Sequence, residues 1–291
     1  MKASQHIFRT RREYNKWVAN ETLEDYSLRF TAESGRLWSI DTVAKTALGA
    51  TAFLALEAIA ASLTLTFGFV NTFWAMIALA FVIVITGLPI SIFAARHGLD
   101  IDLLTRSAGF GYLGSTITSL IYASFTFIFF AIEAAILASA LNAVAGIPLW
   151  IGYILCAVAV IPIVSHGISG LSRFQIRTQW VWLPLQILAI VIICGYEFRE
   201  FNQWIAYTPV PSDISAYQPS TEFNLAFFGA ASAVMFALVA QIGEQVDYLR
   251  FMPIKTAQNS RKWWFWVLMA GPGWFLIGII KMLLGLSLIH I

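Results

Sequence analysis

Long apolar segments alternate with short polar stretches along most of this chain. Each long segment reaches or approaches the roughly 20 apolar residues that a helix needs to cross a bilayer core of about 30 Å. Each is predicted to be helical, because lipid offers no partner to an unpaired backbone group. Seven such segments are predicted, at residues 42–68, 71–94, 115–145, 148–165, 179–196, 223–246 and 262–287.

Composition agrees with the apolar pattern. Hydrophobic residues make up 59% of the 291 residues and charged residues only 12%, whereas soluble domains carry roughly 25% charged residues. Lipid is therefore the expected solvent for most of the chain. The sequence predicts an all-α membrane protein, with a basic tail over residues 1–41 and a membrane domain over residues 42–291.

Lysine and arginine are concentrated in the tail and in alternate connections. Sixteen of the eighteen basic residues lie there, whereas Arg199 lies in an opposite connection and Lys281 within the last segment. By the positive-inside rule, the basic side faces the cytoplasm. The sequence therefore predicts a multi-pass protein of the inner or plasma membrane with a cytoplasmic N terminus.

Several kinds of site are not expected. The chain has no basic stripe with interleaved aromatic residues, so a nucleic-acid partner is not expected. Its histidines and cysteines lack zinc-ligand spacing, and no catalytic constellation is visible, so neither a metal site nor an organic cofactor is expected. Residues 109–114 match a dinucleotide fingerprint, but that fingerprint needs a βαβ unit. These glycines are expected to form a tight turn instead.

Two glutamates lie within apolar segments, where a carboxylate is a candidate functional group. Glu57 lies midway along the first segment, and Glu133 lies midway along the third, one turn after Phe129. Two interpretations stay open for each glutamate: a wall of a solute pocket, or a protonated side chain that makes one interhelical hydrogen bond. We expect both to line a solute pocket, with Phe129 as an apolar wall.

The sixth segment ends in a polar run that contains Gln241, Gly243, Glu244 and Asp247. Gly243 and these polar groups could interrupt the helix near its cytoplasmic end, and interrupted helices supply carbonyls and dipoles to transported ions. Alternatively, the two carboxylates reach the headgroups and Arg250. Gln241 is a candidate solute-binding residue.

Three sets of short motifs lie in order on the predicted cytoplasmic side. Residues 25–39 contain Asp-Tyr-Ser-Leu-Arg-Phe and Arg-Leu-Trp-Ser, residues 95–115 contain Ala-Arg-His-Gly-Leu and Leu-Thr-Arg, and residues 246–251 read Val-Asp-Tyr-Leu-Arg-Phe. In sequence and position they resemble the motifs of the nucleobase:cation symporter family, which includes purine, cytosine and hydantoin permeases. The resemblance implies a structural or gating role for Arg106, Asp247 and Arg250.

The resemblance implies a leucine-transporter-like fold of two inverted five-helix repeats and two further helices. Helices 1 and 6 would be unwound around a small organic solute. Na⁺ or H⁺ is the candidate coupling ion, at a site between helices 1 and 8. This chain would hold about seven helices and be truncated at its C terminus. Phe129 stands where family members often have tryptophan, and Glu133 where they have Gln or Gly, which argues against a plain nucleobase as solute.

Residues 17–24 and 125–135 more closely resemble the transporter-like module at the front of certain bacterial hybrid sensor histidine kinases. Two functions therefore stay open. The first is transport of a small organic solute with a cation. The second is a sensory input domain of a membrane histidine kinase. Expected partners are the solute, the lipid bilayer and, for the second function, a C-terminal kinase module in the same gene.

Overall fold

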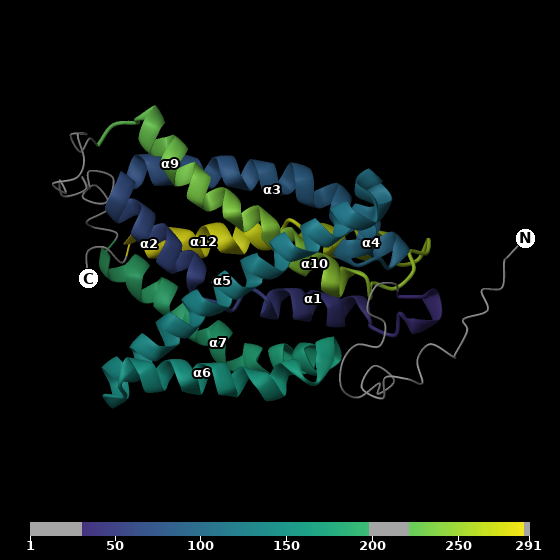
Figure 1. The fold of residues 1–291 in the computed structure, drawn as a ribbon, viewed down its shortest axis with the longest axis horizontal. Coiled ribbons are helices and arrows are strands. Elements are labelled where there is room, and N and C mark those ends of the chain that lie inside the picture. Colours follow the sequence, from purple (N-terminus) through teal and green to yellow (C-terminus); the bar gives the residue numbers. More distant parts are fainter. Residues whose placement is uncertain (1–30, 198–220, 288–291) are drawn as a thin grey trace, which may run out of the picture.

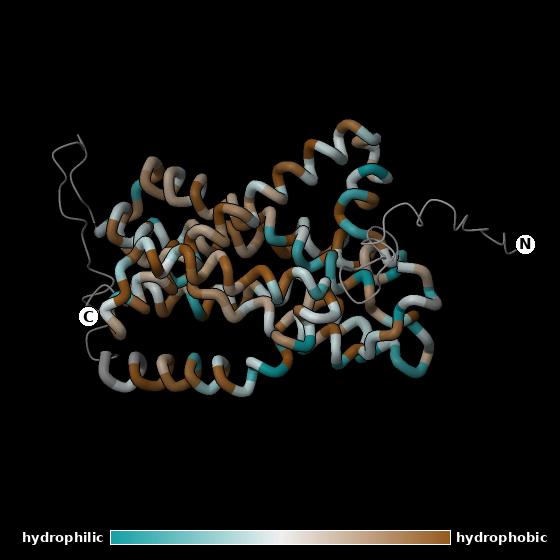
Figure 2. The backbone as a smooth tube through the Cα atoms, turned by 60° about the horizontal axis from the view of Figure 1, so that its bottom comes forward, coloured by the Kyte–Doolittle hydropathy of each residue, from teal (hydrophilic) through white to brown (hydrophobic). Residues whose placement is uncertain are grey.

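The computed structural model of the chain describes residues 31–197 and 221–287. Within these residues every regular element is helical and no β-strand is present, as the apolar segments predict. The helices form an elongated bundle, in which α3 (Phe69–His97), α6 (Leu149–Val164) and α12 (Trp274–Ser287) run lengthwise (Figure 1). Hydrophobic residues colour most of the helices in Figure 2, and hydrophilic residues cluster at the end of the bundle nearest the N-terminal trace.

Part of the predicted set of membrane spans is present in the structure. Four stretches are long and apolar enough to cross a membrane, and a fifth is added if α6 and α7, bent by 113° at their junction, count as one broken span. Such helices are those expected of a membrane protein, but the predicted number of seven is not reproduced. The first segment is divided into short helices, and the fourth and fifth segments, α6 and α7, count only together as one bent pair. The four stretches are Phe69–His97, Ile101–Ala145, Leu225–Leu249 and Ser260–Leu286.

The helix at the fifth predicted segment begins earlier than the sequence predicts. Helix α7 spans Gly167–Glu197, whereas the sequence predicts a helix over residues 179–196. Arg173 and Arg177 therefore lie on the helix and not in a connection. Apolar periodicity marks only the part of a helix that suits lipid, so it misses the polar turns that extend the same helix.

The first predicted segment is interrupted. Helix α1 (Ile40–Gly49) and helix α2 (Ala55–Phe67) are separated by residues 50–54, where the Thr51 hydroxyl donates to the Leu48 carbonyl at 2.7 Å. A threonine that binds a nearby carbonyl in this way competes with helical hydrogen bonding. Glu57 therefore lies in the first turn of α2, and not midway along one continuous helix.

The sixth predicted segment is also interrupted, one turn earlier than its polar run suggests. Helix α9 (Leu225–Met235) passes into a 3₁₀ stretch, η5 (Phe236–Gln241), and then into α10 (Ile242–Leu249). Gly243 is helical, and a Cβ there would lie 2.8 Å from the ring of Tyr122. That glycine serves close packing between helices and does not break its own helix.

The turn between the second and third long helices is built on glycine, as predicted. After α4 (Ile101–Thr105), a π-helical turn over Arg106–Phe110 leads into α5 (Gly111–Ala145). Gly109 has a φ of 106° and Gly111 a φ of 64°. Side chains with a Cβ rarely adopt these angles, so glycine is needed for the chain to change direction here.

The last predicted segment forms α11 (Ser260–Ala270) and α12, with a break at residues 271–273. Helix α12 packs closely on α2 because Gly278 and Gly285 face it. A Cβ at Gly285 would lie 2.7 Å from the Cα of Glu57. Small residues allow such close approach between membrane helices.

Two hydrophobic clusters hold the bundle together. The first joins α2, α9 and α12 to the first half of α3, and the second joins α1, α10 and α11 to its last turns. The halves of each interrupted segment thus belong to different clusters, and the interruptions lie between them. Buried members of the first cluster include Leu56, Met76, Leu79, Met235 and Phe275, and those of the second include Val43, Val246, Leu249, Met252 and Trp263.

Candidate functional site

The interrupted parts of the first and sixth segments face each other between the two clusters. They enclose a small cavity of about 10 Å³, which is roughly the space for one water molecule. Gln241 Nε2 donates to Glu244 Oε2 at 3.5 Å, and Gln241 Oε1 is buried with no hydrogen-bond partner among the described residues. The cavity is lined by Ala47, Ala50, Thr51, Gln241, Glu244, Gln245, Tyr248 and Trp274.

The side chain of Glu133 caps the N-terminal end of α2. Its Oε1 accepts a hydrogen bond at 2.6 Å from the backbone N–H of Ala55, the first residue of that helix. The first N–H groups of a helix lack partners within it and carry partial positive charge, so a carboxylate stabilises them. Glu133 thus makes an interhelical hydrogen bond, but to backbone and not to another side chain.

Phe129 forms an aromatic wall beside the same interruption. Its ring packs edge-on against that of Phe53, with the ring centroids 5.9 Å apart. The centroid of the Phe125 ring lies 4.4 Å from that of Phe129. Phe53 belongs to the stretch between α1 and α2, so α5 covers this stretch with both a carboxylate and an aromatic ring. The structure therefore places Phe129 and Glu133, one turn apart on α5, against the stretch between α1 and α2.

Glu57 is paired inside the protein. The Nζ of Lys281, on α12, lies 3.0 Å from Glu57 Oε1, and Gln186 Nε2, on α7, donates to the same oxygen at 3.2 Å. Glu57 is 7% exposed and Lys281 1%. Glu57 Oε2 is buried without a hydrogen-bond partner in the part of the chain that the structure describes.

The structure places the three residues assigned to a structural or gating motif on two elements. Arg106 pairs with Asp102 at 2.7 Å within its own turn. Asp247 Oδ2 accepts from the hydroxyl of Tyr122 at 3.4 Å, which ties α10 to α5. Arg250 Nε donates to the carbonyl of Asp247 at 3.1 Å. Asp247 and Arg250 therefore act at the end of α10, and Arg106 acts at the start of α5.

The motif segments meet at one end of the bundle. Arg36 Nη1 donates to the carbonyls of Ala95 and Arg96, each at 3.1 Å, in the last turn of α3. Trp38 stacks on Phe251 with centroids 4.6 Å apart. Cations favour helix C termini, where carbonyls lack partners within the helix. Segments distant in sequence thus form one basic end.

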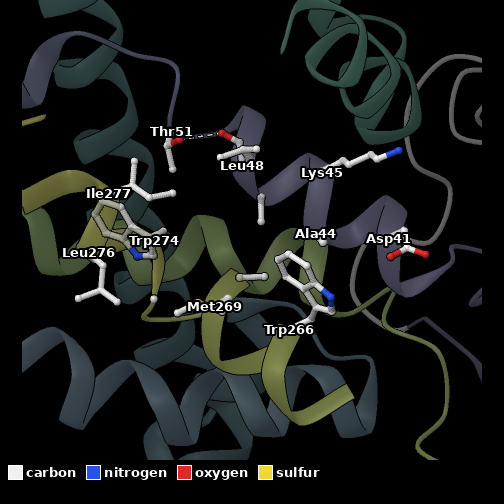
Figure 3. Close-up of a pocket in the computed structure, with 13 residues that line it drawn as sticks. Asp41, Ala44, Lys45, Leu48, Thr51, Trp266, Met269, Trp274, Leu276 and Ile277 are labelled. Carbon is white, nitrogen blue, oxygen red and sulfur yellow. Dashed lines mark hydrogen bonds between the residues drawn. The ribbon is translucent and has the colours of Figure 1, made fainter. Parts of the chain in front are cut away.

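A larger cavity of about 590 Å³ lies between α1 and the α11–α12 pair. Its walls are mostly apolar, and its size is that of pockets for small organic molecules. Thr51 and Trp274 lie towards one end and Asp41 with Lys45 towards the other, with Trp266 between them (Figure 3). Thr51 and Trp274 also line the small cavity, so the two cavities adjoin at the interruption.

The partner of Glu57 is the residue that sequence reasoning missed. Lys281 stands out as a charge in an apolar segment, and ionisable side chains inside membrane helices commonly pair with one another. Its neighbours one turn before and after, Gly278 and Gly285, were a second signal of close packing. Only the tertiary structure shows that the partner is Glu57.

Within residues 31–197 and 221–287, no group of three or more His, Cys, Asp or Glu side chains is placed to hold a metal ion. The relationship to nucleobase:cation symporters stays a prediction from the motifs. Comparison with models of known protein families, with curated proteins and with solved structures finds no match to this chain.

Proposed function

We propose that this chain is the solute-binding part of a transporter-like membrane domain. The observation that carries the proposal is that residues 50–54 and Phe236–Gln241, two interruptions in apolar helices, face each other inside the bundle. At membrane depth, irregular backbone is tolerated only where it is buried in protein or lines a cavity. Paired discontinuous helices are the usual solute sites of secondary transporters.

The charges at the interruptions favour a neutral or cationic small organic solute. Glu133 already occupies the positive end of α2, where a solute carboxylate would otherwise bind. Glu244 adds a second carboxyl group, which is half-buried and lines the small cavity. Phe129 and Trp274 supply aromatic surface against which a planar or apolar part of the solute can pack.

Solute binding would stabilise one arrangement of the interrupted helices over another. A ligand shifts such an equilibrium only by its difference in affinity for the two states. In a transporter this shift exposes the site to the other side of the membrane. We further propose that the basic end of the bundle faces the cytoplasm, as the positive-inside rule predicts.

A second candidate is the sensory input domain of a membrane histidine kinase. It is favoured by the Glu57–Lys281 pair, in which the chain itself supplies the charge that a coupling ion would bring. A sensor needs different solute affinities in two states but no ion-driven flux. The same site would then bind its solute to change the position of a helix.

The test is a binding screen of the purified chain in lipid nanodiscs. Nucleobases, nucleosides, hydantoins, amino acids and amines are ranked by thermal shift, and the dissociation constant of the best compound is measured by calorimetry. Gln241→Ala and Thr51→Val are expected to weaken its binding about tenfold, roughly one lost polar contact.

Thr66→Val is the matched control, because Thr66 is exposed and its hydroxyl, like that of Thr51, donates to a backbone carbonyl a few residues earlier in the chain. It is expected to bind like wild type. A screen without any binder, or unchanged affinity in both site variants, contradicts the proposal. Uptake of the labelled compound into liposomes would identify a transporter.

A further inference from the structure

A buried ion pair joins α2 to α12 beside the first hydrophobic cluster, and Lys281 Nζ makes no hydrogen bond among the described residues. Glu57 and Lys281 belong to α2 and α12, whose neighbouring apolar residues form the first hydrophobic cluster. Leu56 and Met282, next to the two charges in sequence, are both fully buried. Such surroundings disfavour any charge that has no opposite charge beside it.

The position of the lysine is specified by the packing around it. Gly278 and Gly285 lie one turn before and after Lys281 and let the α12 backbone approach α2. A long side chain near a membrane surface can reach water along its stem. Lys281 is instead held inward, at 1% exposure, with its ammonium 3.0 Å from Glu57 Oε1.

Within the part of the chain that the structure describes, Lys281 is the cation paired with Glu57. Gln186, from α7, contributes an uncharged amide to the same oxygen. Glu133, from α5, interacts electrostatically with both members of the pair, and it adds negative charge. Without Lys281, two carboxyl groups would remain at the first turn of α2. One would then need a proton or a free cation.

We propose that the Lys281 ammonium is the resident counter-cation of Glu57, in place of a free monovalent cation or a proton. Helices α2 and α12 are therefore held together without a sodium ion at Glu57. Removing the lysine is expected to turn Glu57 into a site that depends on external Na⁺ or on protonation. This inference does not depend on the identity of the solute or on the proposed transport.

The experiment compares melting temperatures of the full chain in nanodiscs with sodium chloride and with choline chloride at equal ionic strength. Wild type is expected to melt at the same temperature in both salts. Lys281→Met keeps most of the length of the side chain and removes its charge, so its Tm in choline is expected to be about 10 °C lower. Sodium ions, or mildly acidic pH, are expected to restore several degrees of this loss.

The double variant Glu57→Gln with Lys281→Met separates charge balance from packing. It has neither charge, so it is expected to melt well above Lys281→Met and to respond to neither sodium nor pH. If Lys281→Met alone does not fold, a folded and salt-insensitive double variant still supports the proposal. A double variant as damaged as the single one overturns it, because packing would then be the whole effect.

Two further outcomes also overturn the proposal. One is a wild-type Tm that rises in sodium relative to choline and loses that rise in Glu57→Gln, because a free cation would then already serve Glu57. The other is a folded Lys281→Met chain that responds neither to sodium nor to acid. All these measurements are made without solute, so their failure is distinct from failure of the binding screen.

Discussion

The backbone N–H of Ala55 donates to Glu133 Oε1 at 2.6 Å, so a side chain of α5 caps the helix that begins beyond the first interruption. The N-terminal end of α2, which carries partial positive charge, is therefore occupied by a protein side chain. This contact makes the stability of the interrupted helix depend on a residue 78 positions away.

Glu133→Ala is expected to destabilise the chain by about 1 kcal/mol, the usual loss when a helix cap is removed. Glu133→Gln keeps an acceptor oxygen and is expected to lose less stability than Glu133→Ala. Thermal unfolding in nanodiscs measures both. Formate or acetate should partly restore the Ala variant by binding at the vacated helix end, and chloride at equal concentration should not. Equal stability of wild type and both variants contradicts the capping role.

Gly285→Ala is expected to destabilise the chain by about 1–3 kcal/mol, because its Cβ would overlap the backbone of Glu57 and force α12 away from α2. Gly229→Ala is the matched control, since nothing lies within 4 Å of a Cβ there. In a helix that control should be neutral or slightly stabilising. Comparison of the two melting temperatures tests the packing, and equal effects argue against it.

Arg36→Ala is expected to loosen the last turn of α3, because the carbonyls of Ala95 and Arg96 lose their shared donor. The free energy of unfolding should fall by about 1–3 kcal/mol, as for the loss of hydrogen bonds to a charged group. Hydrogen exchange read by mass spectrometry should show faster exchange in peptides that cover residues 90–98. Arg36→Lys keeps the charge but not the forked geometry, so partial protection is expected. Unchanged exchange in the Ala variant contradicts this role.

Membrane orientation can be tested with single cysteines at Gln258 and Ala145, which are both exposed in the structure. The background replaces Cys156 and Cys194 with alanine. If the basic end faces the cytoplasm, an impermeant maleimide should label position 145 in intact cells and position 258 only after permeabilisation. The reverse pattern would invert the proposed topology.

The sequence by itself determined the all-helical character and most of the long helices. Apolar runs of sufficient length leave the backbone no alternative to a helix in lipid, and this constraint is local. The helix over residues 148–165 was predicted within one residue at each end of α6. The glycine turn at residues 109–114 was likewise visible, because positive φ angles belong to the residue itself.

Only the tertiary structure decided where the helices break and which charges meet. The interruption at residues 50–54 lies in a run as apolar as its neighbours, and it is closed by Glu133 from another helix. Glu57 and Glu133 were both candidates from sequence, yet one pairs with Lys281 and the other caps a backbone N–H. A charged residue within an apolar segment indicates from the sequence that a partner is needed, because desolvation penalises any unpaired charge. The partner itself is set by packing between segments far apart in the chain, as where Gly285 brings α12 against Glu57.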